Sequence, residues 1–244
     1  MTEAEKVVAH ARKTIRDLNI PLPQGEYQYA HLALCVVDSV YSLGVRYESV
    51  ERTVADCCRR LRWEQDRKKS TVEHSISEFL NILSPYENRW EALADEVFRN
   101  RQRTSTRSGI LKAEAVYRFA KTLQQFRVET FVDALNFTQR DLLRRAITSI
   151  PGQGSGLSFN YFLILAGDTS AVKADRMVTR FVADALGVRT VSPEACEQLV
   201  RDAVAILRSE FPRLTPSLLD YGIWNYQRQQ EESRDLHCSR AAAS

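Results

Sequence analysis

Apolar residues recur at helical spacing along most of this chain, and this periodicity favours an all-helical fold. One face of a predicted helix, for example, carries Met177, Val178, Phe181, Val182, Ala185 and Leu186. Gly187 follows and is placed to end that helix, because glycine readily takes the left-handed conformation at a helix C-terminus. Nine glycines and seven prolines in 244 residues are few for the many tight turns of a β-sandwich or barrel. We therefore predict the all-α class.

The same spacing sets the expected organisation of the chain. Helices are predicted over residues 4–18, 27–42, 47–69, 71–83, 87–99, 109–126, 128–136, 139–149, from 157 or 158 onward, from 175 to 186, 193–209 and 215–228. Two prolines and a glycine in residues 20–25 interrupt the pattern. We expect an N-terminal helix and linker (1–26), one large helical domain (27–228) and a polar, flexible tail (229–244).

Charge and hydropathy limit the partners and the cellular location that we expect. The net charge is only +3, so a nucleic-acid surface would have to come from local clusters of Arg and Lys. Residues 1–18 are charged throughout and lack the apolar core of a signal peptide. No apolar run approaches the roughly 20 residues of a membrane span. We expect a cytoplasmic protein without a membrane partner.

Cysteine and histidine spacing indicates no metal or redox site. The five cysteines are Cys35, Cys57, Cys58, Cys196 and Cys238, an odd number with no C-x-x-C pair. The four histidines are scattered along the chain. Neither a zinc site nor an iron–sulfur cluster is expected, and we expect no cofactor.

A glycine-rich turn, Gly152-Gln153-Gly154-Ser155-Gly156, separates two predicted helices. Glycine takes positive φ and allows another molecule close to the backbone. The N–H groups at the start of the following helix, together with the helix dipole, suit an anion such as a DNA phosphate. An ordinary helix–helix turn would also use glycine, and both interpretations stay open. No Lys-Ser/Thr follows the glycines and no strand precedes them, which excludes a P-loop and a dinucleotide fold.

Asp175 stands at the start of the apolar helix described first. The simple interpretation is an N-cap, which accepts hydrogen bonds from backbone amides. A catalytic role is compatible with capping, because the helix dipole stabilises an ionised carboxylate there. A carboxylate beside a scissile glycosidic bond stabilises a cationic sugar and can activate water.

The stretch that joins these two features resembles the helix-hairpin-helix (HhH-GPD) superfamily of DNA glycosylases. The family pattern is an apolar residue, P-G-x-G, an apolar helix and then V-D-x-x-V-x-R; here residues 150–154 read IPGQG and residues 174–180 read ADRMVTR. The interval between the turn and the aspartate also fits. Upstream, SGILKA at 108–113 resembles the opening of a family helix, and 42–50 resembles an early family loop. The resemblance covers roughly residues 28–228.

The resemblance implies a two-lobed helical fold with a DNA-binding cleft, into which a flipped nucleotide enters. It maps the family aspartate onto Asp175 and makes the hairpin a phosphate grip on double-stranded DNA. Family members that also cleave the backbone carry a lysine where this chain has Gly156, which implies a monofunctional enzyme that uses water. The early loop often supplies a glutamine that fills the gap left by the flipped base; Gly44 stands there instead. The family's cysteine cluster is absent, and we expect a monomer.

Further candidates for DNA contact are basic. Arg101, Arg103 and Arg107 lie in a run rich in Ser and Thr, which commonly contact phosphates, although a solvated loop is equally compatible. Lys173, close to Asp175, is a phosphate contact or a solvated charge.

Two residues are candidates for a base pocket. Asp38 is a carboxylate on a largely apolar helix, where it could bond a flipped base or serve a structural role. Tyr161 could stack on a base, although core packing is the commoner use of tyrosine.

The leading hypothesis is therefore a DNA glycosylase that removes a damaged or modified base and leaves an abasic site. Alkylated, mismatched or deaminated bases and the bulky bases of phage DNA remain open, and with them DNA repair or antiviral defence. A non-catalytic helix-hairpin-helix module that binds DNA is the alternative. A helical scaffold for protein interactions, with Asp175 only as a cap, is a weaker third.

Overall fold

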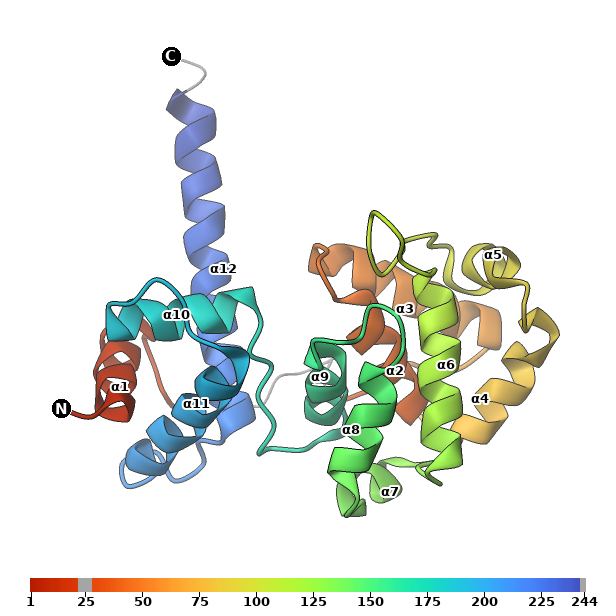
Figure 1. Cartoon of the computed structure of the whole chain (residues 1–244), viewed down its shortest axis with the longest axis horizontal. Helices are drawn as coiled ribbons and strands as arrows, with labels where there is room; N and C mark the ends of the chain where they lie inside the picture. The colour runs from red at the N-terminus through yellow and green to blue at the C-terminus, as the bar shows by residue number, and fades with distance from the viewer. Residues whose placement is uncertain (22–27, 242–244) are drawn as a thin grey trace. The chain divides into compact units, whose positions relative to one another are not determined.

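The computed structural model describes residues 1–21 and 28–241, and they form an all-helical protein (Figure 1). The predicted all-α class is confirmed. The described residues form no strand, only two isolated antiparallel bridges, Tyr29 with Asp66 and Arg103 with Leu111. The chain divides into two compact units: Met1–Leu22 with Thr169–Ser244, and Pro23–Asp168. We refer to them as unit 1 and unit 2.

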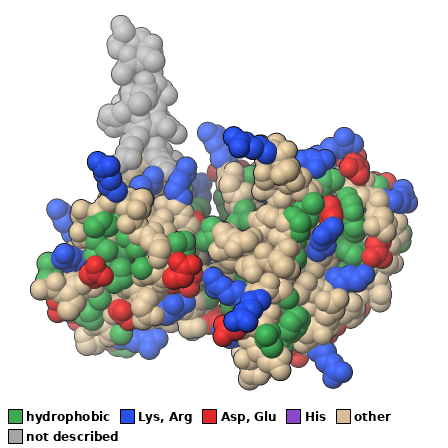
Figure 2. All heavy atoms as spheres, in the orientation of Figure 1, with side chains coloured by type: hydrophobic (Ala, Val, Ile, Leu, Met, Phe, Trp, Pro, Cys, Tyr) green, Lys and Arg blue, Asp and Glu red, His purple; other side chains and the backbone are tan. Residues whose placement is uncertain are grey.

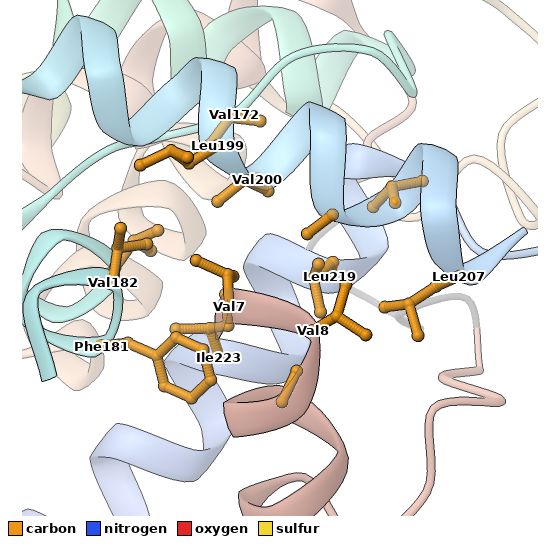
Figure 3. Packing of buried hydrophobic residues seen from close by; sticks show 14 of the residues in the cluster. Val7, Val8, Val172, Phe181, Val182, Leu199, Val200, Leu207, Leu219 and Ile223 are labelled. Carbon is orange, nitrogen blue, oxygen red and sulfur yellow. The ribbon is translucent and has the colours of Figure 1, made fainter. Parts of the chain in front are cut away.

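Unit 1 combines the first helix of the chain with its last three. Its helices are α1 (Glu3–Thr14), α10 (Arg176–Leu186), α11 (Pro193–Leu207) and α12 (Pro216–Ala241). Figure 3 shows how their apolar faces meet: Val7 and Val8 of α1 lie among Phe181 of α10, Val200 of α11 and Ile223 of α12. The sequence interpretation, which set residues 1–26 apart as a leading segment, did not foresee this packing of α1 into the core of unit 1.

Local sequence explains where α1 begins. Thr2 accepts a hydrogen bond from the Glu5 amide, and the Glu5 side chain accepts one from the Thr2 amide, so that a capping box fixes the first turn. Helical spacing then buries Val7, Val8 and Ala11 on one face. The helix ends at Thr14, four residues earlier than predicted.

Unit 2 holds the remaining helices. They are α2 (Leu32–Tyr41), α3 (Tyr47–Leu61), α4 (Ile76–Leu83), the 3-10 turn η1 (Ser84–Tyr86), α5 (Trp90–Leu93), the π-helical η2 (Ala94–Phe98), α6 (Lys112–Gln125), α7 (Phe131–Asn136), α8 (Arg140–Thr148) and α9 (Leu157–Ala166). Every residue of α2 is buried, as is every residue of α9 after the first. These two helices pack against each other, as expected of helices that are apolar on all sides.

Several predicted boundaries are wrong. Helix α3 stops at Leu61, because Arg62 takes the left-handed conformation, so residues 62–69 of the predicted helix are not helical. A capping box between Ser75 and Glu78 delays α4 to Ile76. Helix α12 continues to Ala241, beyond the predicted end at 228 and into the segment that we expected to be flexible. The predicted start of the second helix at residue 27 lies outside the described residues, as do residues 22–25 of the predicted break.

Three further observations concern the described residues. None of their helices combines the length and apolar character needed to cross a bilayer. No cluster of three or more His, Cys, Asp or Glu side chains among them could hold a metal ion. Cys35, Cys57, Cys58 and Cys196 are buried free thiols.

Candidate functional site

The glycine-rich turn of unit 2 folds as a tight hairpin between α8 and α9. Gly152 has a φ of 85° and Gly156, the N-cap of α9, a φ of 72°, conformations that favour glycine. No described residue accepts a hydrogen bond from the amides of Gly152, Gly154 or Ser155, and these three residues are exposed. Amides without an acceptor just before a helix N-terminus suit the binding of an anion.

Gln153 does not share this exposure. Its amide donates to the carbonyl of Ile150 at 2.9 Å, and its side chain is completely buried. The structure therefore removes Gln153 from the predicted residues that could touch a ligand directly, and leaves it the role of holding the turn closed.

The hairpin contacts the loop that carries the predicted basic run. A Cβ atom added to Gly152 would lie 2.2 Å from the Cβ of Thr104, so only glycine fits against this loop. The loop itself is closed by backbone hydrogen bonds from Thr104 to Ile110 (2.9 Å) and from Lys112 to Gln102 (2.8 Å). Two segments that the sequence suggested separately as phosphate contacts are thus adjacent in unit 2.

The three arginines of that loop have different surroundings. Arg101 forms an exposed ion pair with Asp95, an arrangement of small net stability. Arg103 donates to the carbonyl of Gly109 at 2.9 Å and helps to hold the loop. Arg107 is exposed, and none of the described residues pairs with its guanidinium. Arg107 is therefore the most available cation of the run.

Three side chains near the hairpin have buried polar atoms without a hydrogen-bond partner among the described residues. These atoms belong to the Thr104 hydroxyl, the side-chain amide of Gln153 and the Ser158 hydroxyl. Leaving such a group unsatisfied costs about 1–3 kcal/mol, so folding alone does not favour this arrangement. Polar groups of this kind are a feature of functional regions.

Arg144 is a residue at the hairpin that the sequence interpretation missed. Its Nη1 donates to Asn160 Oδ1 at 2.8 Å, and its Nη2 lies 2.8 Å from where a Cβ on Gly156 would stand. The guanidinium thus covers Gly156, at the start of α9. No described carboxylate pairs with it, whereas Arg140, one turn earlier on α8, pairs with Asp168. The pair of arginines four residues apart on α8 was the only sequence signal.

In unit 1, Asp175 is the N-cap of α10. Its Oδ1 accepts hydrogen bonds from the amides of Met177 (2.8 Å) and Val178 (3.1 Å). The predicted N-cap and the predicted end at Gly187 are both confirmed. No described residue donates to Oδ2, and the side chain is only half-buried. One carboxylate oxygen is fixed by the helix, while the other has no hydrogen-bond donor among the described residues.

A second carboxyl group lies behind the loop that leads to Asp175. Asp220 of α12 is buried, 8% exposed, and its Oδ1 accepts the backbone amide of Lys173 at 3.0 Å. Burial, and then the charge of Asp175, raise the pKa of Asp220 well above its ordinary value, while Lys173 opposes the shift. The sequence analysis missed Asp220, an aspartate in the apolar segment LLDYGI; such a residue is a signal of the same kind as Asp38.

The two candidates for a base pocket are both in the buried helices of unit 2. Asp38 Oδ2 accepts hydrogen bonds from the hydroxyls of Tyr29 (2.8 Å) and Tyr47 (3.2 Å). Burial, and next the nearby Asp38 charge, raise the pKa of Tyr29 well above its usual range, which keeps that hydroxyl a donor. Tyr161 is buried within α9. Asp38 has a structural hydrogen-bonding role, and neither residue is exposed.

The loop that contains Gly44 is held by a buried lysine. Lys112 Nζ donates to the carbonyls of Tyr41 (2.9 Å) and Leu43 (2.8 Å), at the end of α2. Burial lowers the pKa of Lys112 to about 8. Gly44 is exposed with a φ of 69°, and nothing lies within 4 Å of where its Cβ would be.

The match of the chain to a family model extends over both units. A family model, described as a domain of unknown function (DUF8548), matches residues 5–228. The chain belongs to the DUF8548 family. Comparisons with curated proteins and with solved structures gave no match. The DUF8548 match includes the hairpin, Arg144, Asp175 and Asp220, so these features lie within the family's own span.

Surface charge on the DUF8548 chain is mixed. On the face shown in Figure 2, Lys and Arg side chains lie at several separate places with Asp and Glu side chains among them. This agrees with a net charge of only +3. Any electrostatic attraction of a polyanion must therefore come from local clusters of charge.

Proposed function

We propose that this protein hydrolyses the N-glycosidic bond of a damaged or modified base in DNA and leaves an abasic site. The observation that carries the proposal is the arrangement of Asp175. Two amides orient its carboxylate through Oδ1, while Oδ2 accepts nothing from the described residues. A fixed carboxylate with one available oxygen can stabilise a cationic sugar and orient or deprotonate water.

The hairpin supports DNA as the substrate. Three exposed amides and the N-terminus of α9 favour an anion, and Arg144 adds a positive charge at the same place. A cation at a helix N-terminus is unfavourable by itself, because it faces the positive end of the helix dipole. A bound phosphate would offset both charges. Arg107, on the loop adjacent to the hairpin, suits a neighbouring phosphate.

Water is the proposed nucleophile. Gly156 takes the place of the lysine that would form an imine, and the Arg144 guanidinium covers it. A guanidinium stays protonated in proteins and is not a nucleophile. Base flipping costs a few kcal/mol and favours bases that are weakly paired, which agrees with a damaged or modified base as the target.

A substrate screen tests the proposal. Duplexes that carry alkylated, deaminated, mismatched or bulky modified bases would be incubated with the protein and assayed for free base and for abasic sites. We expect release of at least one class of base by the parent and not by Asp175→Asn. Release that is equal in both proteins would contradict the role of Asp175.

A DNA-binding module without catalysis is the second candidate, and Gly44 favours it. A glycine offers no side chain to fill the gap left by a flipped base. This candidate predicts binding that weakens steeply with salt but no base release from any duplex. A helical scaffold would show neither, so the same two measurements separate all three.

A further inference from the structure

Asp220 and Asp175 are joined in unit 1 by two hydrogen bonds through the backbone of Lys173. The Lys173 amide donates to Asp220 Oδ1 at 3.0 Å, and the Asp175 amide donates to the Lys173 carbonyl at 2.6 Å. The turn that leads into α10 is therefore held from behind by a buried carboxyl group. We propose that Asp220 is the positioning residue of Asp175, an inference that rests on the function proposed above.

A buried carboxyl group is an expensive way to hold a turn. Asp220 is 8% exposed on an otherwise apolar segment of α12, where an aliphatic residue would avoid the cost of desolvation. Among the described residues, its only hydrogen-bond partner is the Lys173 amide, two residues before Asp175. The cost of burying Asp220 is thus linked to the position of the Asp175 side chain.

The titratable groups around Asp220 come from several elements of unit 1. Asp175 lies at the start of α10, Lys173 in the loop, and Cys196 and Glu197 on α11. Burial raises the pKa of Asp220 first, and repulsion by Asp175 raises it next. A protonated carboxyl group still accepts the Lys173 amide through its carbonyl oxygen, so the turn is held in either form. Protonation of Asp220 spares Asp175 the repulsion of a second charge.

Hydrogen exchange tests the positioning contact without reference to activity. Asp220→Ala removes the acceptor, so exchange of the Lys173 amide should accelerate. Asp220→Asn keeps an oxygen in the same place and should leave the exchange close to parental. Asp202→Asn, an exposed aspartate on α11, is the matched control and should change nothing. Unchanged exchange at Lys173 in Asp220→Ala would overturn the proposal.

The pH dependence of stability tests the coupling of the two charges. A carboxyl group whose pKa is raised in the folded state makes the protein less stable as pH rises. The loss occurs between the pKa of the unfolded state, ordinarily 3.8, and the pKa of the folded state. The stability of Asp220→Asn relative to the parent should therefore increase as pH rises through that window. Asp175→Asn removes the repulsion, so in that background the same gain should be smaller. Equal gains in both backgrounds would refute coupling.

Base release, once a substrate is known, tests the functional consequence. Asp220→Ala should lower the single-turnover rate about 10- to 100-fold, because a small misplacement of a catalytic group has effects of that order. Asp220→Asn should recover most of that loss, and its rate should no longer vary with pH in the window where Asp220 titrates. A parental rate in Asp220→Ala would overturn the positioning role while the glycosylase proposal stands. If no duplex releases a base, the exchange and stability measurements still decide the structural claim.

Discussion

The replacement Asp175→Asn separates catalysis from helix capping. Asparagine retains an oxygen that can accept the amides of Met177 and Val178, so the start of α10 should be preserved. It removes the negative charge on which both the cationic sugar and the attacking water would depend. Folding should change little, base release should fall and DNA affinity should persist or increase.

The magnitudes follow from the two hydrogen bonds at Oδ1. Asp175→Ala loses both, at about 0.5–2 kcal/mol of stability, which corresponds to about 1–8 °C in Tm for a chain of this size. Asp175→Asn should stay below that range. Loss of a group that assists proton transfer lowers a rate by about 10²- to 10⁴-fold, far more than a lost cap would explain.

The assay compares three variants under one set of conditions. Single-turnover base release, Tm and DNA affinity would be measured on the same preparations of Asp175→Asn, Asp175→Ala and Ser192→Ala. Ser192 caps α11 through the Ala195 amide at 3.2 Å, so its loss removes a cap from the same unit without touching Asp175. We expect parental base release from Ser192→Ala. Near-parental release from Asp175→Asn would leave Asp175 as a cap only.

The other expectations concern the hairpin, the reaction and a buried histidine. Gly154→Val should fold, because the nearest atom to its Cβ is 3.9 Å away, and it should weaken DNA binding in a salt titration; Gly152→Val should instead unfold the hairpin against Thr104, as a loss of Tm would show. With Gly156 at the lysine position, borohydride should trap no covalent complex on substrate DNA. Burial, and next the neighbouring His74, lower the pKa of His31 to about 4, whereas its ordinary pKa is 6.5. Between these two pH values the unfolded chain binds a proton at His31 that the folded state does not bind. His31 should therefore not reduce the free energy of unfolding above pH 6.5, but should lower it by about 3 kcal/mol toward pH 4. Urea titrations of His31→Asn should lack that loss.

Each of these has a result that contradicts it. A folded Gly154→Val protein with parental DNA affinity would show that the hairpin is not a phosphate grip. A trapped complex would overturn the monofunctional assignment. Parallel pH curves for the parent and His31→Asn would place the acid sensitivity elsewhere.

The sequence predicted those features that depend on local physics. The helix between Asp175 and Gly187 was bounded correctly at both ends, because its cap, apolar face and glycine stop are close together in the sequence. The end of α3 was missed, since Arg62 takes a left-handed conformation that glycine or asparagine would have signalled. Residues 59–69, which follow the apolar positions of α3, are mostly charged and gave no sign of the break.

The features that the sequence did not predict depend on packing between residues far apart in the chain. The contact of Asp220 with Lys173 spans 47 positions, and no spacing rule reaches so far. The place of α1 in unit 1 likewise depends on a face of α11 nearly 200 residues away. Thr104 was noted only as part of a polar run, whereas its methyl and hydroxyl groups explain why Gly152 must be glycine.

Helix ends hold the groups that support the proposed function in both units. Every α-helix leaves amides unsatisfied at its start and carbonyls at its end, so these positions offer binding chemistry even where side chains are apolar. In unit 2 the hairpin presents amides before α9, and Lys112 satisfies carbonyls at the end of α2. In unit 1 the amides at the start of α10 hold Asp175. Because backbone groups set this geometry, a variant that changes charge but keeps a cap, as Asp175→Asn does, tests function. Gly152→Val, by contrast, changes the turn itself and tests fold and function together.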